Sequence, residues 1–440
     1  MGNSWCLRGG LSRVVMVREG EEQALLWSFS YFFFLLAAYY LLRPLRDALA
    51  ITGGVRHLPW LFTASFVSLV LLQPVFSGLV AWLPRPRFIP LIYHFFAANI
   101  IFFWLLLSWH VGSVYVARSF FVWVSVFNLF VVSVFWSFMA DIYTSEQSKR
   151  LFGVIGAGGT AGGLLGPLLA VGLSRSLGAT NLLIMSALLL EVAVLSAWRL
   201  ERAVSGLTNA EHPSPVGSSA ERLARHAAII GGDALDGARR LFGSPYLAGI
   251  AAWICLLSFC ATVLYLQQAN IVATVVHGRS EQTRIFASID LSVGLLTFVT
   301  QTLATGPLII RFGVGAAAAF LPFVFVWGFT ALAVAPGLAT IVIFQAVQRT
   351  AHFAVSTPAR QAFFTVVERR DKYKVKNLID LVVYRGSDAL WSWLFLAVKN
   401  AGLSLAQIAA TAVPMAIVWL AISVALGRTL ERRAAVPYAL

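Results

Sequence analysis

Long apolar stretches follow one another along almost the whole chain and are separated by short polar segments. A membrane-spanning helix needs about 20 predominantly apolar residues, and the apolar stretches reach that length repeatedly. We place twelve spans near residues 23–46, 58–82, 88–109, 115–140, 151–173, 179–199, 246–272, 285–310, 315–335, 338–364, 376–398 and 405–427. The pattern therefore predicts an all-α polytopic membrane protein with twelve transmembrane helices.

The composition agrees with this prediction, and the distribution of charge indicates how the protein is oriented in the membrane. Of the residues, 59% are hydrophobic and 12% are charged, whereas a soluble domain carries about 25% charged residues. The net charge is +14, but the cations lie mainly in alternate short loops, which argues against a nucleic-acid partner. If both termini are cytoplasmic, about 22 of the 33 Lys and Arg residues lie on that side and about 8 lie opposite. We therefore expect cytoplasmic termini.

The longest polar connection divides the predicted spans into two halves. It covers about residues 200–245, and its first part reads as a flexible linker. Its later part fits either an in-plane helix on anionic lipid headgroups or a plain solvated linker. We expect a cytoplasmic segment 1–22, a six-helix bundle 23–199, a cytoplasmic linker 200–245, a second six-helix bundle 246–427 and a cytoplasmic tail 428–440.

Two loops resemble a known membrane fold. The segments from Gly78 to Arg87 and from Gly306 to Gly313 resemble the glycine-plus-arginine loop of the major facilitator superfamily, although its usual aspartate is missing. Six plus six pseudo-symmetric helices around a long central loop is the pattern of that superfamily. The resemblance implies a transporter with its site between the halves.

The first span ends in charged residues that lipid would not tolerate unaided. Arg43, Arg46 and Asp47 share one helical face, and Pro44 predicts a kink beside them. An ionisable group at the bilayer centre costs roughly 2.5–3.5 kcal/mol, so such groups normally face a protein interior or an aqueous path. We interpret this face as a contact for an anionic ligand, because arginine matches carboxylate and phosphate oxygens.

Span ten predicts a second polar face, from the other half. Gln345, Gln348, Arg349 and His352 recur at helical spacing, and Arg360 lies close to three full turns beyond Arg349. The remaining candidate solute contacts are Tyr40, Asn128, Gln268 and Arg385. The alternative is that the arginines are held in structural ion pairs with Asp47, Asp290, Asp380 or Asp388.

Other polar residues are candidates for gating or coupling. Asp290 within span eight is either a proton carrier or the counter-ion of an arginine, and the sequence leaves both open. The candidates at the cytoplasmic rim are Lys149, Arg150, Lys374 and Lys376, and Asp380 is a further candidate for gating or coupling. In span five, Gly158, Gly162 and Gly166 recur every four residues, which favours close helix packing over a dinucleotide-binding loop.

Three separated segments resemble the ATP/ADP antiporter family, the nucleotide exchangers of plastids and intracellular parasites. They are Leu42 to Asp47, Phe135 to Gly153, and Thr357 to Gln361 followed by Lys374, Lys376 and Asp380. Gln361 stands where that family has an acidic residue, and Arg46 stands in place of its lysine. The resemblance implies a short, divergent, bacterial-type member in the inner membrane.

We therefore expect a monomeric secondary transporter that moves an anionic, nucleotide-like solute by alternating access. An empty cavity with unpaired arginines would be expensive to occlude, which favours exchange. Two alternatives remain: a proton-coupled carrier of a siderophore, metabolite or drug, and a non-transporting membrane enzyme or scaffold. The sequence shows no nucleophile triad or metal-ligand cluster, and its three cysteines give no disulfide framework, so we expect no cofactor.

Overall fold

The computed structural model describes residues 18, 21–82, 85–109, 113–208, 239, 241–367, 375–376 and 378–435. Every regular element in these residues is a helix. The N-terminal half contains α2 (Glu22–Thr52), η1 (Val55–His57), α3 (Leu58–Trp82), α4 (Arg85–Ser108), α5 (Ser113–Ile142), α6 (Ser145–Leu173), η2 (Ala179–Asn181) and α7 (Leu182–Thr208). The C-terminal half contains α10 (Pro245–Val275), α11 (Arg279–Thr300), η3 (Gln301–Thr305), α12 (Gly306–Val334), α13 (Leu338–Ala351), η4 (His352–Ser356), α14 (Thr357–Phe363), η5 (Leu378–Val383), α16 (Tyr384–Asn400) and α17 (Leu405–Ala435).

All twelve predicted spans coincide with helical segments. Within the described residues, 11 helices are long and apolar enough to cross a membrane. The twelfth predicted span, 376–398, corresponds to the π-helical segment η5 followed directly by α16. The prediction of an all-α polytopic protein is therefore confirmed.

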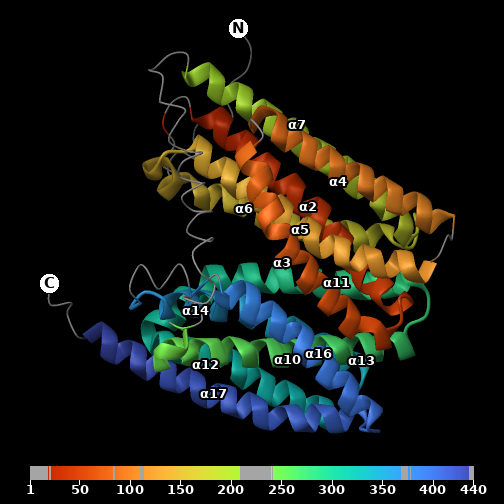
Figure 1. Ribbon diagram of the computed structural model, residues 1–440, viewed down its shortest axis with the longest axis vertical. Helices are drawn as coiled ribbons and strands as arrows, with labels where there is room; N and C mark the ends of the chain where they lie inside the picture. Colours follow the sequence, from red (N-terminus) through yellow and green to blue (C-terminus); the bar gives the residue numbers. More distant parts are fainter. Residues whose placement is uncertain are drawn as a thin grey trace.

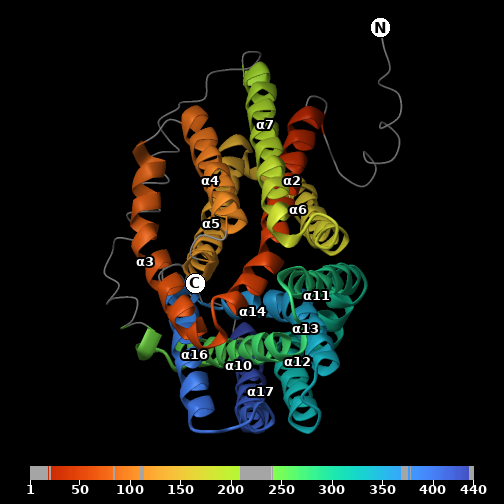
Figure 2. The same cartoon turned by 90° about the vertical axis from the view of Figure 1, so that its right-hand side faces the viewer.

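The helices form two bundles, one from each half of the chain. In both views α2 to α7 gather on one side and α10 to α17 on the other (Figures 1 and 2). Helix α2 begins and α17 ends at the same end of the molecule, on the left of Figure 1. The in-plane helix was predicted in the later part of the 200–245 linker, and most of that part lies outside the described residues, which omit 209–238 and 240.

The glycines of α6 allow this helix to press against α2. A Cβ atom added to Gly162 would lie 2.0 Å from the carbonyl oxygen of Phe33, and one added to Gly166 would lie 2.7 Å from that of Ala37. Any side chain at these positions would separate the two backbones. These glycines therefore serve close packing, as their spacing predicts.

The two bundles are joined by side-chain contacts at the end opposite the beginning of α2 and the end of α17. Nε of Arg175, after α6, donates to Oε1 of Glu281 on α11 at 2.5 Å. On the other flank, Nε1 of Trp393 on α16 donates to Oγ1 of Thr63 on α3 at 3.1 Å, and its ring packs edge-on against Trp60. These contacts close that end of the interface.

Candidate functional site

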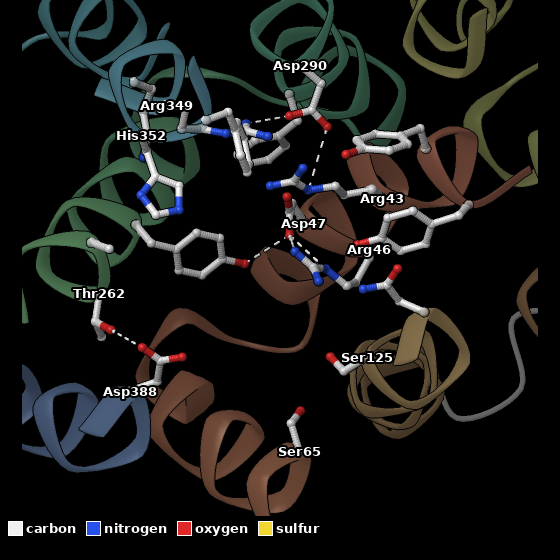
Figure 3. Close-up of a pocket in the computed structure, with 18 of the residues that line it drawn as sticks. Arg43, Arg46, Asp47, Ser65, Ser125, Thr262, Asp290, Arg349, His352 and Asp388 are labelled. Carbon is white, nitrogen blue, oxygen red and sulfur yellow. Dashed lines mark hydrogen bonds and ion pairs between the residues drawn. The ribbon is translucent and has the colours of Figure 1, made fainter. Parts of the chain in front are cut away.

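A cavity of about 550 Å³ lies between the two bundles. Helices α2, α3 and α5 line it from the N-terminal half, and α10, α11, α13, η4 and α16 line it from the C-terminal half. A pocket of this size suits a small organic solute. Figure 3 shows charged side chains from both halves pointing toward one another across it.

Most of the residues proposed from the sequence line this cavity. They are Tyr40, Arg43, Arg46, Asp47, Asn128, Gln268, Asp290, Arg349, His352 and Arg385. Arg360 is not among the lining residues, and its Nη1 atom lies 3.7 Å from Oδ1 of Asp380. The expected continuation of the span-ten face from Arg349 to Arg360 is wrong, because the π-helical η4 lies between them. A π turn contains more residues than an α turn, so it rotates everything beyond it around the helix.

Asp290 is the centre of one ion-pair network. Nη1 of Arg349 donates to its Oδ1, and Nε of Arg43 lies 3.8 Å from its Oδ2. The aspartate side chain is only 4% exposed, whereas the two arginines are 15% and 20% exposed. Of the two roles that the sequence leaves open for Asp290, these contacts favour the counter-ion.

Asp47 holds a second network beside the first. Its Oδ1 accepts hydrogen bonds from Nε and Nη2 of Arg46 at 2.9 and 2.7 Å, and from the hydroxyl of Tyr265 on α10 at 3.0 Å. The guanidinium of Arg46 also lies over the Phe121 ring, 5.0 Å from its centroid. Tyr265 thus connects the charged face of α2 to the C-terminal bundle.

Asp388 on α16 is a third buried carboxylate at the cavity wall. Its Oδ1 accepts hydrogen bonds from Oγ of Ser258 at 2.6 Å and from Oγ1 of Thr262 at 3.3 Å, both on α10. Nη1 of Arg385 lies 3.9 Å from its Oδ2. Sequence reasoning treated Asp388 only as a partner for an arginine. The sequence feature that could have indicated this site is the pair of hydroxyl side chains of Ser258 and Thr262, one turn apart on span seven.

The charges of the wall nearly balance. Four arginines (43, 46, 349 and 385) face three aspartates (47, 290 and 388), so the formal sum is 4 − 3 = +1 with His352 neutral. Each arginine lies within 4 Å of one of these carboxylates. The ion pairs that the structural alternative predicted are therefore present. The four arginines that form them also line the cavity.

Several polar atoms at the wall have unused hydrogen-bonding capacity. Within the part of the chain that the structure describes, Oγ of Ser65, Oδ2 of Asp290 and Nδ1 of His352 are buried and make no hydrogen bond. A chain of amide hydrogen bonds runs nearby from Gln348 through Gln345 to Gln268, at 2.9 and 2.7 Å. The wall can therefore accept and donate further hydrogen bonds.

The rim candidates whose side chains the structure describes, Arg150 and Lys376, and the gating candidate Asp380 are not among the residues that line the cavity. Nη2 of Arg150 donates to Oε1 of Glu21 at 2.9 Å, and Nζ of Lys376 donates to Oε1 of Gln361 at 2.7 Å. Burial opposes ionisation of Glu21, but the hydrogen bonds from Arg150 and Gln147 outweigh it and lower the pKa of that carboxyl. The side chain of Lys149 and the whole of Lys374 lie outside what the structure describes.

No known family model matches the chain, and neither does any curated protein. Solved structures do match it. A bacterial homologue of the iron transporter ferroportin, in an inward-facing state, matches with a TM-score of 0.65 and 11% identity over 93% of this chain and 98% of the other. A bacterial homologue of the human lysosomal transporter Spinster, inward-facing and unoccupied, matches with a TM-score of 0.59 and 15% identity over 95% and 99%.

The nucleoside transporter NupG matches as well, with a TM-score of 0.55 and 14% identity over 95% of this chain and 100% of the other. At these identities the likeness establishes the fold alone. The predicted major-facilitator-type architecture of two helical bundles is thereby confirmed.

Proposed function

We propose that the protein is a secondary transporter that moves an anionic organic solute by alternating access, with the cavity between the bundles as its solute site. The observation that carries this proposal is the Asp290 network, in which Arg43 from one bundle and Arg349 from the other meet one carboxylate at the cavity wall. A solute bound there contacts both bundles at once. Fold-level likeness to structures of transporters supports the same function class.

Arg43 is the residue best placed to receive the solute. Its Nε is 3.8 Å from Asp290, beyond hydrogen-bonding distance, and the carboxylate is held more closely by Arg349. A carboxylate or phosphate oxygen of the solute could therefore bind the Arg43 guanidinium without breaking a hydrogen bond to Asp290. The rings of Tyr40 and Phe121 beside the arginines offer faces for an aromatic part of the solute.

The charge balance of the cavity limits the charge of the solute. With a formal sum of +1, a single negative charge neutralises the wall. A nucleoside triphosphate would bring several uncompensated charges into a low-dielectric space, which is costly. We therefore narrow the nucleotide-like solute implied by the family resemblance to an organic anion of low charge.

The ion pairs also bear on the mode of transport. Exchange was expected because unpaired arginines would make an empty cavity expensive to occlude. In the structure each arginine of the wall already has a carboxylate partner. We therefore propose net transport, in which the empty protein also reorients.

The contacts between the two bundles indicate which conformational state of the proposed transport cycle the structure represents. Arg175 and Glu281 close the end opposite the beginning of α2 and the end of α17. If the termini are cytoplasmic, as the charge pattern predicts, we propose that this arrangement is inward-facing.

A binding screen followed by transport tests this function. Purified protein is screened by thermal shift against aromatic carboxylates and sulfonates and against nucleoside mono- and triphosphates, and hits are tested for labelled uptake into proteoliposomes. We expect low-charge anions to stabilise the protein and to be taken up. Arg43→Gln should weaken binding about tenfold or more, whereas Arg360→Gln, an arginine outside the cavity wall, should retain it. A melting temperature that no anion changes would instead favour a non-transporting protein.

A further inference from the structure

The three carboxylates at the cavity wall differ in how closely a cation neutralises them. Asp47 accepts two hydrogen bonds from Arg46, and Asp290 accepts one from Arg349 with Arg43 beyond it. Asp388 receives no guanidinium hydrogen bond in the described structure, and its nearest cation is 3.9 Å away. It is nevertheless buried, with its side chain 12% exposed, compared with 10% for Asp47 and 4% for Asp290.

The hydrogen bonds to Asp388 come from neutral groups. Ser258 and Thr262 donate to one oxygen, and the same hydroxyls can accept a hydrogen bond from a protonated carboxyl. Arg385, the nearest cation, is itself 46% exposed, so its charge is partly screened by solvent. These surroundings can therefore stabilise the neutral, protonated form of Asp388 as well as its ionised form.

The other charged side chains at the cavity wall pair with other groups, so Arg385 remains the nearest cation to Asp388. The charged and titratable groups that line the cavity with Asp388 are Tyr39, Tyr40, Arg43, Arg46 and Asp47 on α2, Tyr265 on α10, Asp290 on α11, Arg349 on α13, His352 on η4, and Tyr384 and Arg385 on α16. Tyr265 and Arg46 hydrogen-bond to Asp47, Arg349 hydrogen-bonds to Asp290, and Arg43 lies 3.8 Å from Asp290. Figure 3 shows Asp388 beside Thr262 and apart from the cluster around Arg43 and Asp290.

We propose that Asp388 takes up a proton together with the solute and releases it after the solute has left, so that transport is coupled to protons. This inference rests on the proposed function. The proton comes from the water of the compartment to which the cavity is open and adds to a carboxylate oxygen of Asp388. When the cavity opens to the other side, the same O–H bond breaks and the proton returns to water there.

The coupling follows from the charge of the wall. Protonation of Asp388 raises the formal sum from +1 to +2 and releases Arg385 from its only nearby carboxylate at the wall. Both changes strengthen binding of an anion. By reciprocity, a bound anion strengthens binding of the proton. For a solute with one negative charge, the proton and the solute cross together without moving net charge.

Infrared titration of the purified protein tests the protonation site without a known substrate. We expect a carboxylic-acid C=O band that appears as the pH is lowered from 8 to 5.5. The band should be absent in Asp388→Asn and retained in Asp380→Asn, whose carboxylate lies outside the cavity wall. In Ser258→Ala it should change frequency without disappearing, because one hydrogen-bond partner is lost. A band that survives in Asp388→Asn, or no such band in the unmodified protein, would overturn the proposal.

Benzenesulfonate tests the coupling, because it is an aromatic anion whose single charge does not change over this pH range. We expect the unmodified protein to bind it about fivefold or more tightly at pH 5.5 than at pH 8, and Asp388→Asn to bind it equally at both. Equal binding at both pH values in the unmodified protein would refute the coupling. If benzenesulfonate binds at neither pH, this result contradicts the proposed anionic-solute function. The infrared band then tests separately whether Asp388 takes up a proton.

Discussion

Arg43 and Asp290 face each other across the interface between the two bundles, with Nε of the arginine 3.8 Å from Oδ2 of the aspartate. Asp290 is bound more tightly by Arg349, which belongs to its own bundle. In the proposed cycle, the contact between Arg43 and Asp290 is therefore the one that changes as the bundles move, while Arg349 stays with Asp290. The contact across the interface is the longer of the two, which is consistent with the proposed movement of one bundle against the other.

Replacing Asp290 should destabilise the protein strongly. Asp290→Asn leaves two buried guanidinium groups without their carboxylate, and removing one partner of a buried ion pair costs about 3–5 kcal/mol. We expect a lower unfolding temperature in detergent, measured by intrinsic fluorescence. Asp290→Glu keeps the charge and should recover part of the loss. Unchanged stability in Asp290→Asn would show that the arginines are neutralised in another way.

Breaking the Arg175–Glu281 pair should shift the protein toward a state that is open at this end. Spin labels at Ser176 and His277, two exposed positions in opposite halves, report their separation in a variant without the three native cysteines. With Glu281→Gln we expect a larger population at long distance. The charge-swapped protein with Arg175→Glu and Glu281→Arg should return to the original distribution. If Glu281→Gln leaves the distribution unchanged, the pair does not hold this end closed.

Substitution by alanine should have opposite effects on stability at two glycines of α6. At Gly162 the added methyl carbon would lie 2.0 Å from the backbone of α2, so Gly162→Ala should lower the unfolding temperature and abolish uptake. At Gly156 no atom lies within 4 Å of the added carbon, and alanine is favoured over glycine in a helix by about 1 kcal/mol. Gly156→Ala should therefore be neutral or stabilising. Equal effects of the two substitutions would contradict the close approach of α2 and α6.

The Glu21–Arg150 pair should make stability depend on pH in acid. The pKa of Glu21 is lower in the folded protein than its ordinary value of 4.5, so its contribution is present above pH 4.5 and is lost as the pH falls through the lower, folded value. Such a charged hydrogen bond contributes on the order of 1 kcal/mol. We expect Glu21→Gln to unfold at a lower temperature than the unmodified protein at pH 7.

The same comparison at acid pH supplies the control. The difference in unfolding temperature between Glu21→Gln and the unmodified protein should shrink steadily below pH 4.5. A difference that persists undiminished at pH 3 would mean that the substitution acts through packing rather than through charge.

Local spacing allowed the sequence to predict those parts of the site that lie on one uninterrupted helix. Arg43, Arg46 and Asp47 share a face of α2, and that face lines the cavity. Arg360 was misplaced because its position was extrapolated at α-helical spacing across the π-helical η4. Pro358 follows η4 and has no N–H to bond the carbonyl of Ala354, which accepts instead from Thr305. Asp388 was missed as a functional residue because its character depends on Ser258 and Thr262, over 120 positions away in the chain.

The three π-helical segments, η3, η4 and η5, all belong to the C-terminal half of the described chain. Two of them are tied together, because Oγ1 of Thr305 donates to the carbonyl oxygen of Ala354 and Nε2 of Gln301 donates to that of Phe353. A wide turn weakens the regular backbone ladder and gives a helix a place to flex. In the proposed cycle we therefore expect the C-terminal bundle to bend at these wide turns. We expect the N-terminal bundle, in whose described helices α6 packs closely on α2, to move as a stiffer body.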